Sequence, residues 1–134
     1  MQLPLEEMRR EFGERLEEQA LLARLTSARL GGPADALITV GSADELAQAV
    51  RWLWERSLPW RILGGGSNML VSDRGFRGVV VLNRARRIEF HETPATAGVW
   101  AESGANFGLI SRQAGLRGLA GLEWAVGIPG TLGG

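Results

Sequence analysis

The sequence predicts an α+β protein in which a β-α-β unit is followed by a strand-rich section. Two observations carry this prediction. A capped amphipathic helix pattern lies between two short apolar runs within residues 34–63, and four further short apolar runs follow, separated by turn residues. With 134 residues and 45% hydrophobic content, the chain is long and apolar enough to bury a core.

The N-terminal segment predicts a helix that packs on this core. From Leu5 to Leu16, apolar side chains recur at spacings of three and four among charged residues, which places them on one helical face. Residues 26–33 contain two glycines before a proline and predict a tight connection. Residues 34–40 then predict a short strand.

The central helix is marked by a capping box. Ser42 can accept a hydrogen bond from the backbone N–H of Glu45, whose side chain can reach back to Ser42. The helix should end near Arg56, because Pro59 disfavours helical geometry in the residue before it. Residues 60–63 then predict a buried strand.

The rest of the chain predicts further strands and one helix. Asn106 can cap a helix that runs through Ala114 and is closed by Gly115, after which residues 118–134 are rich in glycine. The predicted strands of this section are residues 69–71, 79–82, 88–90 and 99–101.

Composition excludes several classes of function. Fifteen basic and fifteen acidic residues cancel, which argues against nucleic acid and a membrane surface as partners. Every basic residue is arginine, so lysine-dependent chemistry is excluded. The absence of cysteine and the single histidine, His91, disfavour thiol chemistry and a metal site. The charged N-terminus does not resemble a signal peptide, so we expect a cytoplasmic protein.

A first glycine loop, residues 64–68, directly follows the predicted strand at residues 60–63. Glycines allow backbone N–H groups to approach a phosphate without obstruction by Cβ atoms. From this loop alone, a simple turn is an equally good interpretation. Met69 occupies the last glycine position of both G-x-G-x-x-G and G-x-S-x-G, which disfavours a Rossmann domain and an α/β-hydrolase.

A second glycine loop, residues 127–134, has the sequence GIPGTLGG. It combines a turn fixed by proline with four glycines and a threonine hydroxyl, so it offers a second backbone surface to a phosphate. Two such loops suit a pyrophosphate.

Three sequence blocks stand out along the chain, TSARLGGPA at residues 26–34, LGGGSN at 63–68 and GIPGTLGG at 127–134. In this order and at these separations, the three blocks resemble the UDP-N-acetylenolpyruvoylglucosamine reductase family, known as the MurB family. The resemblance extends from about Thr26 to Gly134.

This resemblance implies an FAD-binding fold of the vanillyl-alcohol oxidase and p-cresol methylhydroxylase (PCMH) type, in which two small α+β lobes clasp the cofactor. The first lobe is expected at about residues 20–63, and the second from about residue 64, incomplete at residue 134. Ser67 and Asn68 stand where covalent relatives have a histidine, which implies noncovalent FAD. Carried over by position, the implied cofactor-binding residues are Gly64, Gly65, Gly66, Ser67, Asn68, Gly104, Ala105, Gly127, Ile128, Gly130, Thr131 and Gly133.

The implied activity is the NADPH-dependent conversion of UDP-N-acetylglucosamine enolpyruvate to UDP-N-acetylmuramate, in peptidoglycan synthesis. The family's catalytic serine, arginine and glutamate lie beyond residue 134, so the resemblance places no catalytic residue in this chain. We therefore expect residues 1–134 alone to be inactive and to need the remainder of the full-length chain. Two alternatives stay open, another FAD-linked oxidoreductase of the same fold and a noncatalytic nucleotide-binding fragment.

Other conspicuous residues are interpreted as structural. His91 is a lone histidine on a predicted strand, and we assign it no catalytic role. No spacing argument brings Glu102 and Glu123 together as an acid and base. The three tryptophans between residues 52 and 60 are expected to pack near a helix-strand junction.

Overall fold

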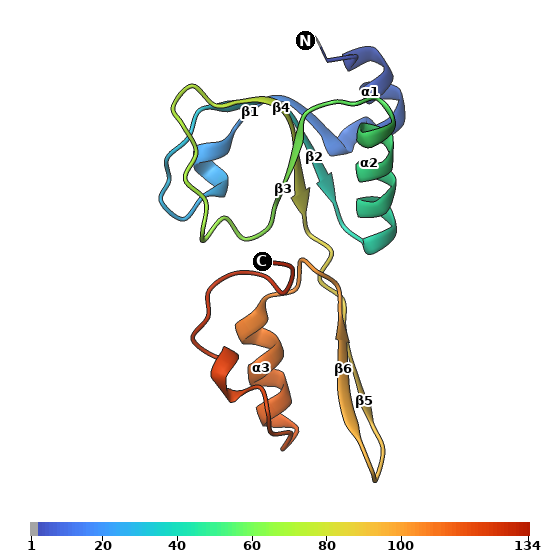
Figure 1. The fold of residues 1–134 in the computed structure, drawn as a ribbon, viewed down its shortest axis with the longest axis vertical. Helices are drawn as coiled ribbons and strands as arrows, with labels where there is room; N and C mark the ends of the chain where they lie inside the picture. The colour runs from blue at the N-terminus through green and yellow to red at the C-terminus, as the bar shows by residue number, and fades with distance from the viewer. Residues whose placement is uncertain (1–2) are drawn as a thin grey trace.

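The computed structural model describes residues 3–134 and has two regions, one built on a sheet and one on a hairpin and a helix (Figure 1). In chain order its helices and strands are α1 Leu5–Phe12, β1 Leu16–Leu21, β2 Pro33–Val40, α2 Ala43–Glu55, β3 Trp60–Leu63, β4 Phe76–Asn83, β5 Ile88–Glu92, β6 Ala97–Ala101 and α3 Phe107–Leu116. Short 3₁₀ helices lie at Gly13–Arg15 (η1), Leu22–Leu25 (η2) and Glu123–Ala125 (η3).

The first region is a four-stranded sheet in the order β1-β2-β4-β3. Strands β2 and β3 both pair in parallel with β4, and α2 connects them, which confirms the predicted β-α-β unit. Strand β1 pairs antiparallel with β2. We predicted that the first helix would reach Leu16, but α1 ends at Phe12, where Gly13 adopts a left-handed φ of 53°. Residues after η1 therefore join the sheet instead.

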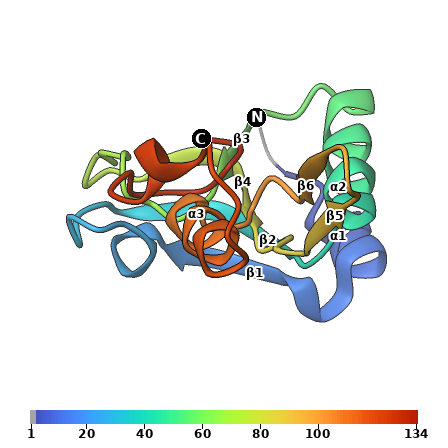
Figure 2. The same cartoon turned by 90° about the horizontal axis from the view of Figure 1, so that it is seen from below.

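Both faces of this sheet are buried. Helices α1 and α2 cover one face, and Figure 2 shows them side by side at one end of the molecule. Residues alternate between the faces, so that Val79 and Val81 of β4 join the helices while Val80 and Leu82 face the other way. As a result of this alternation, an apolar cluster lies on each side of the sheet.

Two strand predictions differ from the structure. β3 is an edge strand whose Arg61 and Ile62 are exposed, so the prediction of a buried strand was wrong. Residues 69–71 form no strand. They belong to a loop whose far end is held by backbone hydrogen bonds to Ser72 O from Gly32 N at 2.9 Å and from Gly75 N at 2.8 Å.

The predicted helix caps are present with small changes. Ser42 Oγ accepts from Glu45 N at 3.2 Å, but the Glu45 carboxylate accepts from Gly41 N at 2.7 Å and not from Ser42. Asn106 Oδ1 accepts from Leu109 N at 2.8 Å and begins α3. Helix α3 ends at Leu116, two residues later than predicted, and the left-handed glycine that follows it is Gly118.

The second region consists of the β5–β6 hairpin, helix α3 and the glycine-rich segment after it. The hairpin forms its own two-stranded sheet. The Arg117 guanidinium links α3 to the hairpin, 4.5 Å from the centre of the Phe90 ring. The lobes were expected at about residues 20–63 and from about residue 64. Because β4 belongs to the first sheet, we propose instead a first lobe of residues 3–83 and a second lobe of residues 84–134. None of the helices in residues 3–134 combines the length and the hydropathy that a membrane span requires.

Candidate functional site

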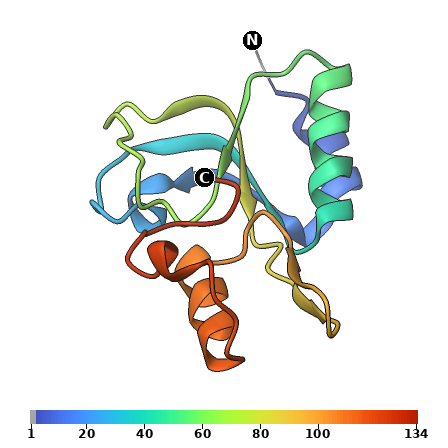
Figure 3. The same cartoon turned by 60° about the horizontal axis from the view of Figure 1, so that its bottom comes forward.

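The two glycine loops face each other across a cleft of about 510 Å³ between the lobes. Figure 3 shows the C-terminal segment beside the chain that leaves β3. The residues lining the cleft are Ile62, Gly64, Gly65, Gly66, Ser67, Asn68, Met69, Phe107, Ile128, Pro129, Gly130, Thr131, Leu132 and Gly134.

The first glycine loop is held against the turn that follows η2. Ser27 N donates to Gly66 O at 3.0 Å. Gly66 has a left-handed φ of 69°, and a Cβ atom there would lie 1.9 Å from Leu25 O. Only glycine fits this position without displacing backbone. Among residues 3–134, the N–H groups of residues 65–68 donate to no protein acceptor.

The second glycine loop is hydrogen-bonded to the segment that leads from β6 into α3. Thr131 forms an antiparallel bridge with Asn106, in which Phe107 N donates to Gly130 O at 3.2 Å and Leu132 N donates to Ala105 O at 2.8 Å. Gly133 N adds a bond to Ser103 O at 2.8 Å. The position of this loop therefore follows the position of residues 103–107.

Small residues let the two loops approach each other. A Cβ atom on Gly64 would lie 2.7 Å from Thr131 Oγ1, and one on Gly130 would lie 3.1 Å from Ser67 Oγ. A Cβ atom on Gly65 would meet its nearest neighbour, Gly130 Cα, at 3.8 Å, which is an ordinary contact. A Cβ atom on Gly65 is therefore tolerated by the protein, and it would occupy space in the cleft.

The chemistry of the cleft suits a flavin dinucleotide. Free backbone N–H groups and the hydroxyls of Ser67 and Thr131 can donate to phosphate oxygens, and no acidic side chain is among the lining residues to oppose an anion. Apolar side chains, including those of Ile62, Phe107 and Ile128, offer contact surface to a flat ring. The residues present therefore fit FAD.

The structure gathers most of the predicted cofactor-binding residues in this cleft. Those that line it are Gly64, Gly65, Gly66, Ser67, Asn68, Ile128, Gly130 and Thr131. Gly104, Ala105, Gly127 and Gly133 are not among the lining residues. Gly104 instead packs closely at the joint between the lobes, where a Cβ atom would lie 2.5 Å from Ala85 O. Gly127 lines a separate hollow beside α3.

Sequence reasoning missed the apolar lining of the cleft. Ile62, Met69, Phe107, Pro129 and Leu132 all line it, yet none carries a chemical signal of its own. A signal was available for four of them, since Ile62 and Met69 lie within two residues of the first glycine loop, and Pro129 and Leu132 belong to the second. Nothing in the sequence marks Phe107, which reaches the cleft because α3 begins there.

The residues interpreted as structural lie outside the cleft. His91 is exposed on β5. Glu102 and Glu123 accept backbone hydrogen bonds in different places, from Ala43 and Arg87 in one case and from Gly121 in the other. Trp52 and Trp60 pack on the core, whereas Trp54 is 74% exposed, so packing was the wrong role for that residue.

Comparison with known proteins defines the class of this chain. The family model described as "FAD binding domain" matches residues 34–134, and the chain belongs to this family. The α+β architecture and the cleft agree with this membership.

Individual relatives narrow the comparison to one group of reductases. The chain is 45% identical to the UDP-N-acetylenolpyruvoylglucosamine reductase of Caldanaerobacter subterraneus subsp. tengcongensis over 84% of its own length and 36% of that protein. It is 40% identical to the same reductase of Carboxydothermus hydrogenoformans over 96% of its own length and 42% of that protein.

A solved structure gives the same result. The crystal structure of UDP-N-acetylenolpyruvylglucosamine reductase (MurB) from Thermus caldophilus aligns with a TM-score of 0.65 and 31% identity, covering 90% of this chain and 40% of that one. The predicted resemblance and the partial PCMH-type FAD-binding fold are thus confirmed. The chain spans 36% to 42% of the length of these relatives.

Proposed function

We propose that this chain is the FAD-binding portion of an NADPH-dependent reductase that converts UDP-N-acetylglucosamine enolpyruvate to UDP-N-acetylmuramate for peptidoglycan synthesis. The observation that carries the proposal is the cleft in which the two glycine loops meet. The similarity of the chain to proteins named as this reductase also supports the proposal. In this proposal the enzyme works in the cytoplasm, and its product serves cell shape and division.

The first glycine loop would hold the pyrophosphate of FAD. Free N–H groups of Gly65, Gly66 and Ser67 would donate to its oxygens, and Thr131 would approach from the opposite loop. Ile128 would contact the flavin. Bound FAD would supply the hydride-transfer chemistry. The FAD would be noncovalent, because no residue of the first loop can form a flavin linkage.

The remaining predicted residues, which do not line the cleft, would act by supporting the second glycine loop. Gly104, Ala105 and Gly133 lie on the segments that carry the second glycine loop, where Gly133 N donates to Ser103 O and Ala105 O accepts from Leu132 N. Gly127 begins that loop. They would hold the loop in place for the cofactor.

Reduction of an enolpyruvyl double bond also needs groups that this cleft does not provide. A proton donor and a cation or hydrogen-bond donor for the substrate carboxylate are required. Charged side chains are missing from the cleft-lining residues. The proposal therefore assigns these roles to other segments of the full-length protein, and we expect residues 1–134 alone to show no substrate-dependent oxidation of NADPH.

Purification and steady-state kinetics of the full-length protein test this proposal. The protein should be yellow, release its flavin on denaturation by acid or heat, and oxidise NADPH faster when the enolpyruvyl sugar nucleotide is added. Flavin that precipitates with the protein would contradict noncovalent binding. Flavin without stimulation by the sugar nucleotide would favour another FAD-linked oxidoreductase, and a protein without flavin affinity would favour a noncatalytic fragment.

A further inference from the structure

Glu102 lies at the joint between the two lobes. It follows β6 in the second lobe and is buried, with 8% of its surface exposed. Its Oε1 accepts from Ala43 N of α2 at 2.8 Å, and its Oε2 accepts from Arg87 N at 2.8 Å. One carboxylate therefore ties the first lobe to the second.

The α2 contact uses the end of a helix that attracts negative charge. Ala43 is the first residue of this 13-residue helix, so its N–H has no acceptor within the helix. Ser42 caps Glu45 N from within the first lobe, whereas Glu102 caps Ala43 N from the second. The helix dipole strengthens a bond to a carboxylate at this position.

A second side-chain bond lies beside the first. Asn83, the last residue of β4, is 4% exposed and donates through Nδ2 to Ser103 Oγ at 2.8 Å. Asn83 Oδ1 also accepts from Ala85 N at 3.1 Å. Residues 102 and 103 are thus both attached to the first lobe by buried polar groups.

This attachment reaches the cleft through the backbone. Residues 103–107 carry the second glycine loop by means of Ser103 O, Ala105 O and Phe107 N. The first glycine loop, in contrast, follows β3 and is held within the first lobe by Ser27 N. The distance between the loops therefore depends on how residue 102 is fixed to the first lobe.

We propose that Glu102 is a positioning residue that locks the second lobe to the first and so sets the spacing of the two glycine loops. The inference rests on the proposed FAD site for its functional consequence, but not for its geometry. Loss of the lock lets the lobes sample other spacings. The apparent affinity for FAD then falls in proportion to the fraction of molecules that keep the competent spacing.

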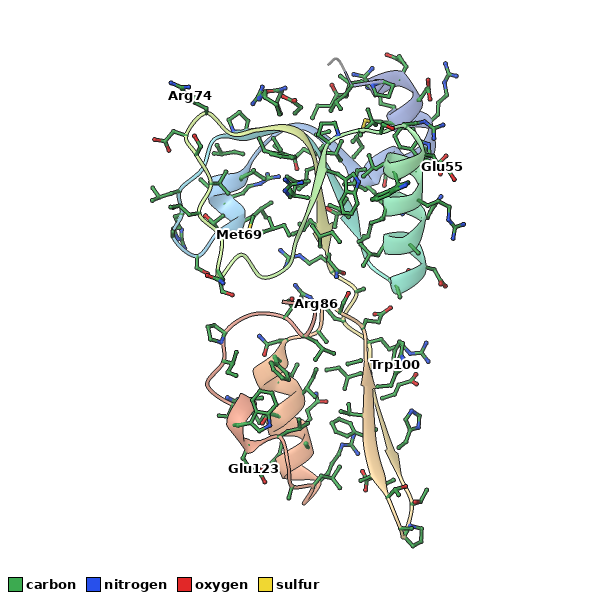
Figure 4. The ribbon with its side chains drawn as sticks, viewed as in Figure 1. Glu55, Met69, Arg74, Arg86, Trp100 and Glu123 are labelled. Carbon is green, nitrogen blue, oxygen red and sulfur yellow. The ribbon has the colours of Figure 1, made fainter. Side chains whose placement is uncertain are left out.

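The surroundings of Glu102 are consistent with a charged carboxylate that joins the lobes. Figure 4 shows Arg86 at the joint between the two regions of the molecule and Trp100 on the hairpin nearby. Other charged side chains that line the hollow of about 570 Å³ at this joint are Asp44, Arg84 and Arg87. Hydrogen bonds from the backbone N–H groups of Arg87 and Ala43 lower the pKa of Glu102, so its carboxylate stays charged at neutral pH.

Glu102→Gln tests the proposal in the full-length protein, with Glu123→Gln as the matched control. Glutamine keeps the shape but turns an NH₂ group toward one of the two backbone donors, so one bond is lost. Glu123 also accepts a backbone hydrogen bond, from Gly121 N at 2.8 Å, but within the second lobe.

The separation of the lobes is measured directly by spin labels. Residues 1–134 contain no cysteine, so once any cysteine elsewhere in the full-length protein has been replaced, the labels are placed by Ala47→Cys on α2 and Leu116→Cys on α3. Both positions are exposed. Double electron-electron resonance without FAD should give a narrow distance distribution in the parent and in Glu123→Gln, and a broader one in Glu102→Gln. FAD affinity, from fluorescence quenching, should fall about tenfold in Glu102→Gln alone.

Each outcome decides the proposal. An unchanged distance distribution in Glu102→Gln would overturn it, as would equal broadening in Glu123→Gln. A broader distribution with unchanged FAD affinity would overturn the claim that the lock sets the spacing of the loops. A broader distribution in Glu102→Gln alone, with no FAD binding by any variant or by the parent, would support the lock and contradict the proposed function.

Discussion

The two lobes contribute to the same cleft from very different supports. Within residues 3–134, both apolar clusters lie in the first lobe, on the two faces of its four-stranded sheet. The second lobe has a two-stranded hairpin with exposed side chains such as Val99 and Trp100, and one helix. The first glycine loop therefore extends from a packed core, whereas the second depends on hydrogen bonds at the joint. The two sides of the cleft thus differ in how much buried apolar packing supports them.

Core truncation in the two lobes should give the largest contrast. Leu53→Ala removes a fully buried side chain between α2 and the sheet and should lower the free energy of unfolding by about 2–5 kcal/mol. Val99 lies on the hairpin and is 37% exposed, so Val99→Ala should change the free energy of unfolding by less than about 0.5 kcal/mol. Denaturant unfolding of both variants measures the difference. Equal losses would show that the hairpin is as well packed as the sheet.

Neighbouring glycines of the first loop should respond differently to a methyl group. Gly66→Ala should lower the free energy of unfolding by at least about 1–2 kcal/mol, because Gly66 has a left-handed backbone and a Cβ atom would lie 1.9 Å from Leu25 O. Gly65→Ala should stay within about 0.5 kcal/mol of the parent, since its Cβ atom has ordinary contacts. Thermal unfolding without FAD checks both. If Gly65→Ala is the more damaging change, the geometry assigned to the loop is wrong.

Replacement of Glu102 at the joint should have a smaller effect on the free energy of unfolding, and this effect should depend on pH. Because the pKa of Glu102 is lowered in the folded protein, its contribution is complete above its ordinary pKa of 4.5 and is lost as the pH falls through the lowered value. The parent should therefore lose more stability than Glu102→Gln between about pH 6 and about pH 3. Denaturant unfolding across this range measures it. Parallel pH profiles would mean that the Glu102 carboxylate does not stabilise the folded state.

Local signals in the sequence predicted most of the helices and strands but not the contacts at the joint between the lobes. Ser42 and Glu45 marked α2, and the apolar run before Gly64 marked β3. Strand β1 was missed because α1 stops at Gly13, and residues 69–71 failed as a strand because no neighbouring strand pairs with them. The lock was not predictable, since Glu102 meets Ala43 across 59 residues. Pairing over that distance is set by tertiary structure, on which local patterns carry no information.

FAD titration of the apoprotein tests the central claim, that the two glycine loops form the cofactor site. Gly65→Val places a branched side chain at the cleft, where a Cβ atom has only ordinary contacts within the protein, and should weaken FAD binding about a hundredfold through loss of two hydrogen bonds to charged oxygens. His91→Ala, on the exposed hairpin, should stay within about twofold of the parent. Similar dissociation constants for the two variants, both folded by thermal unfolding, would contradict the assignment of the site.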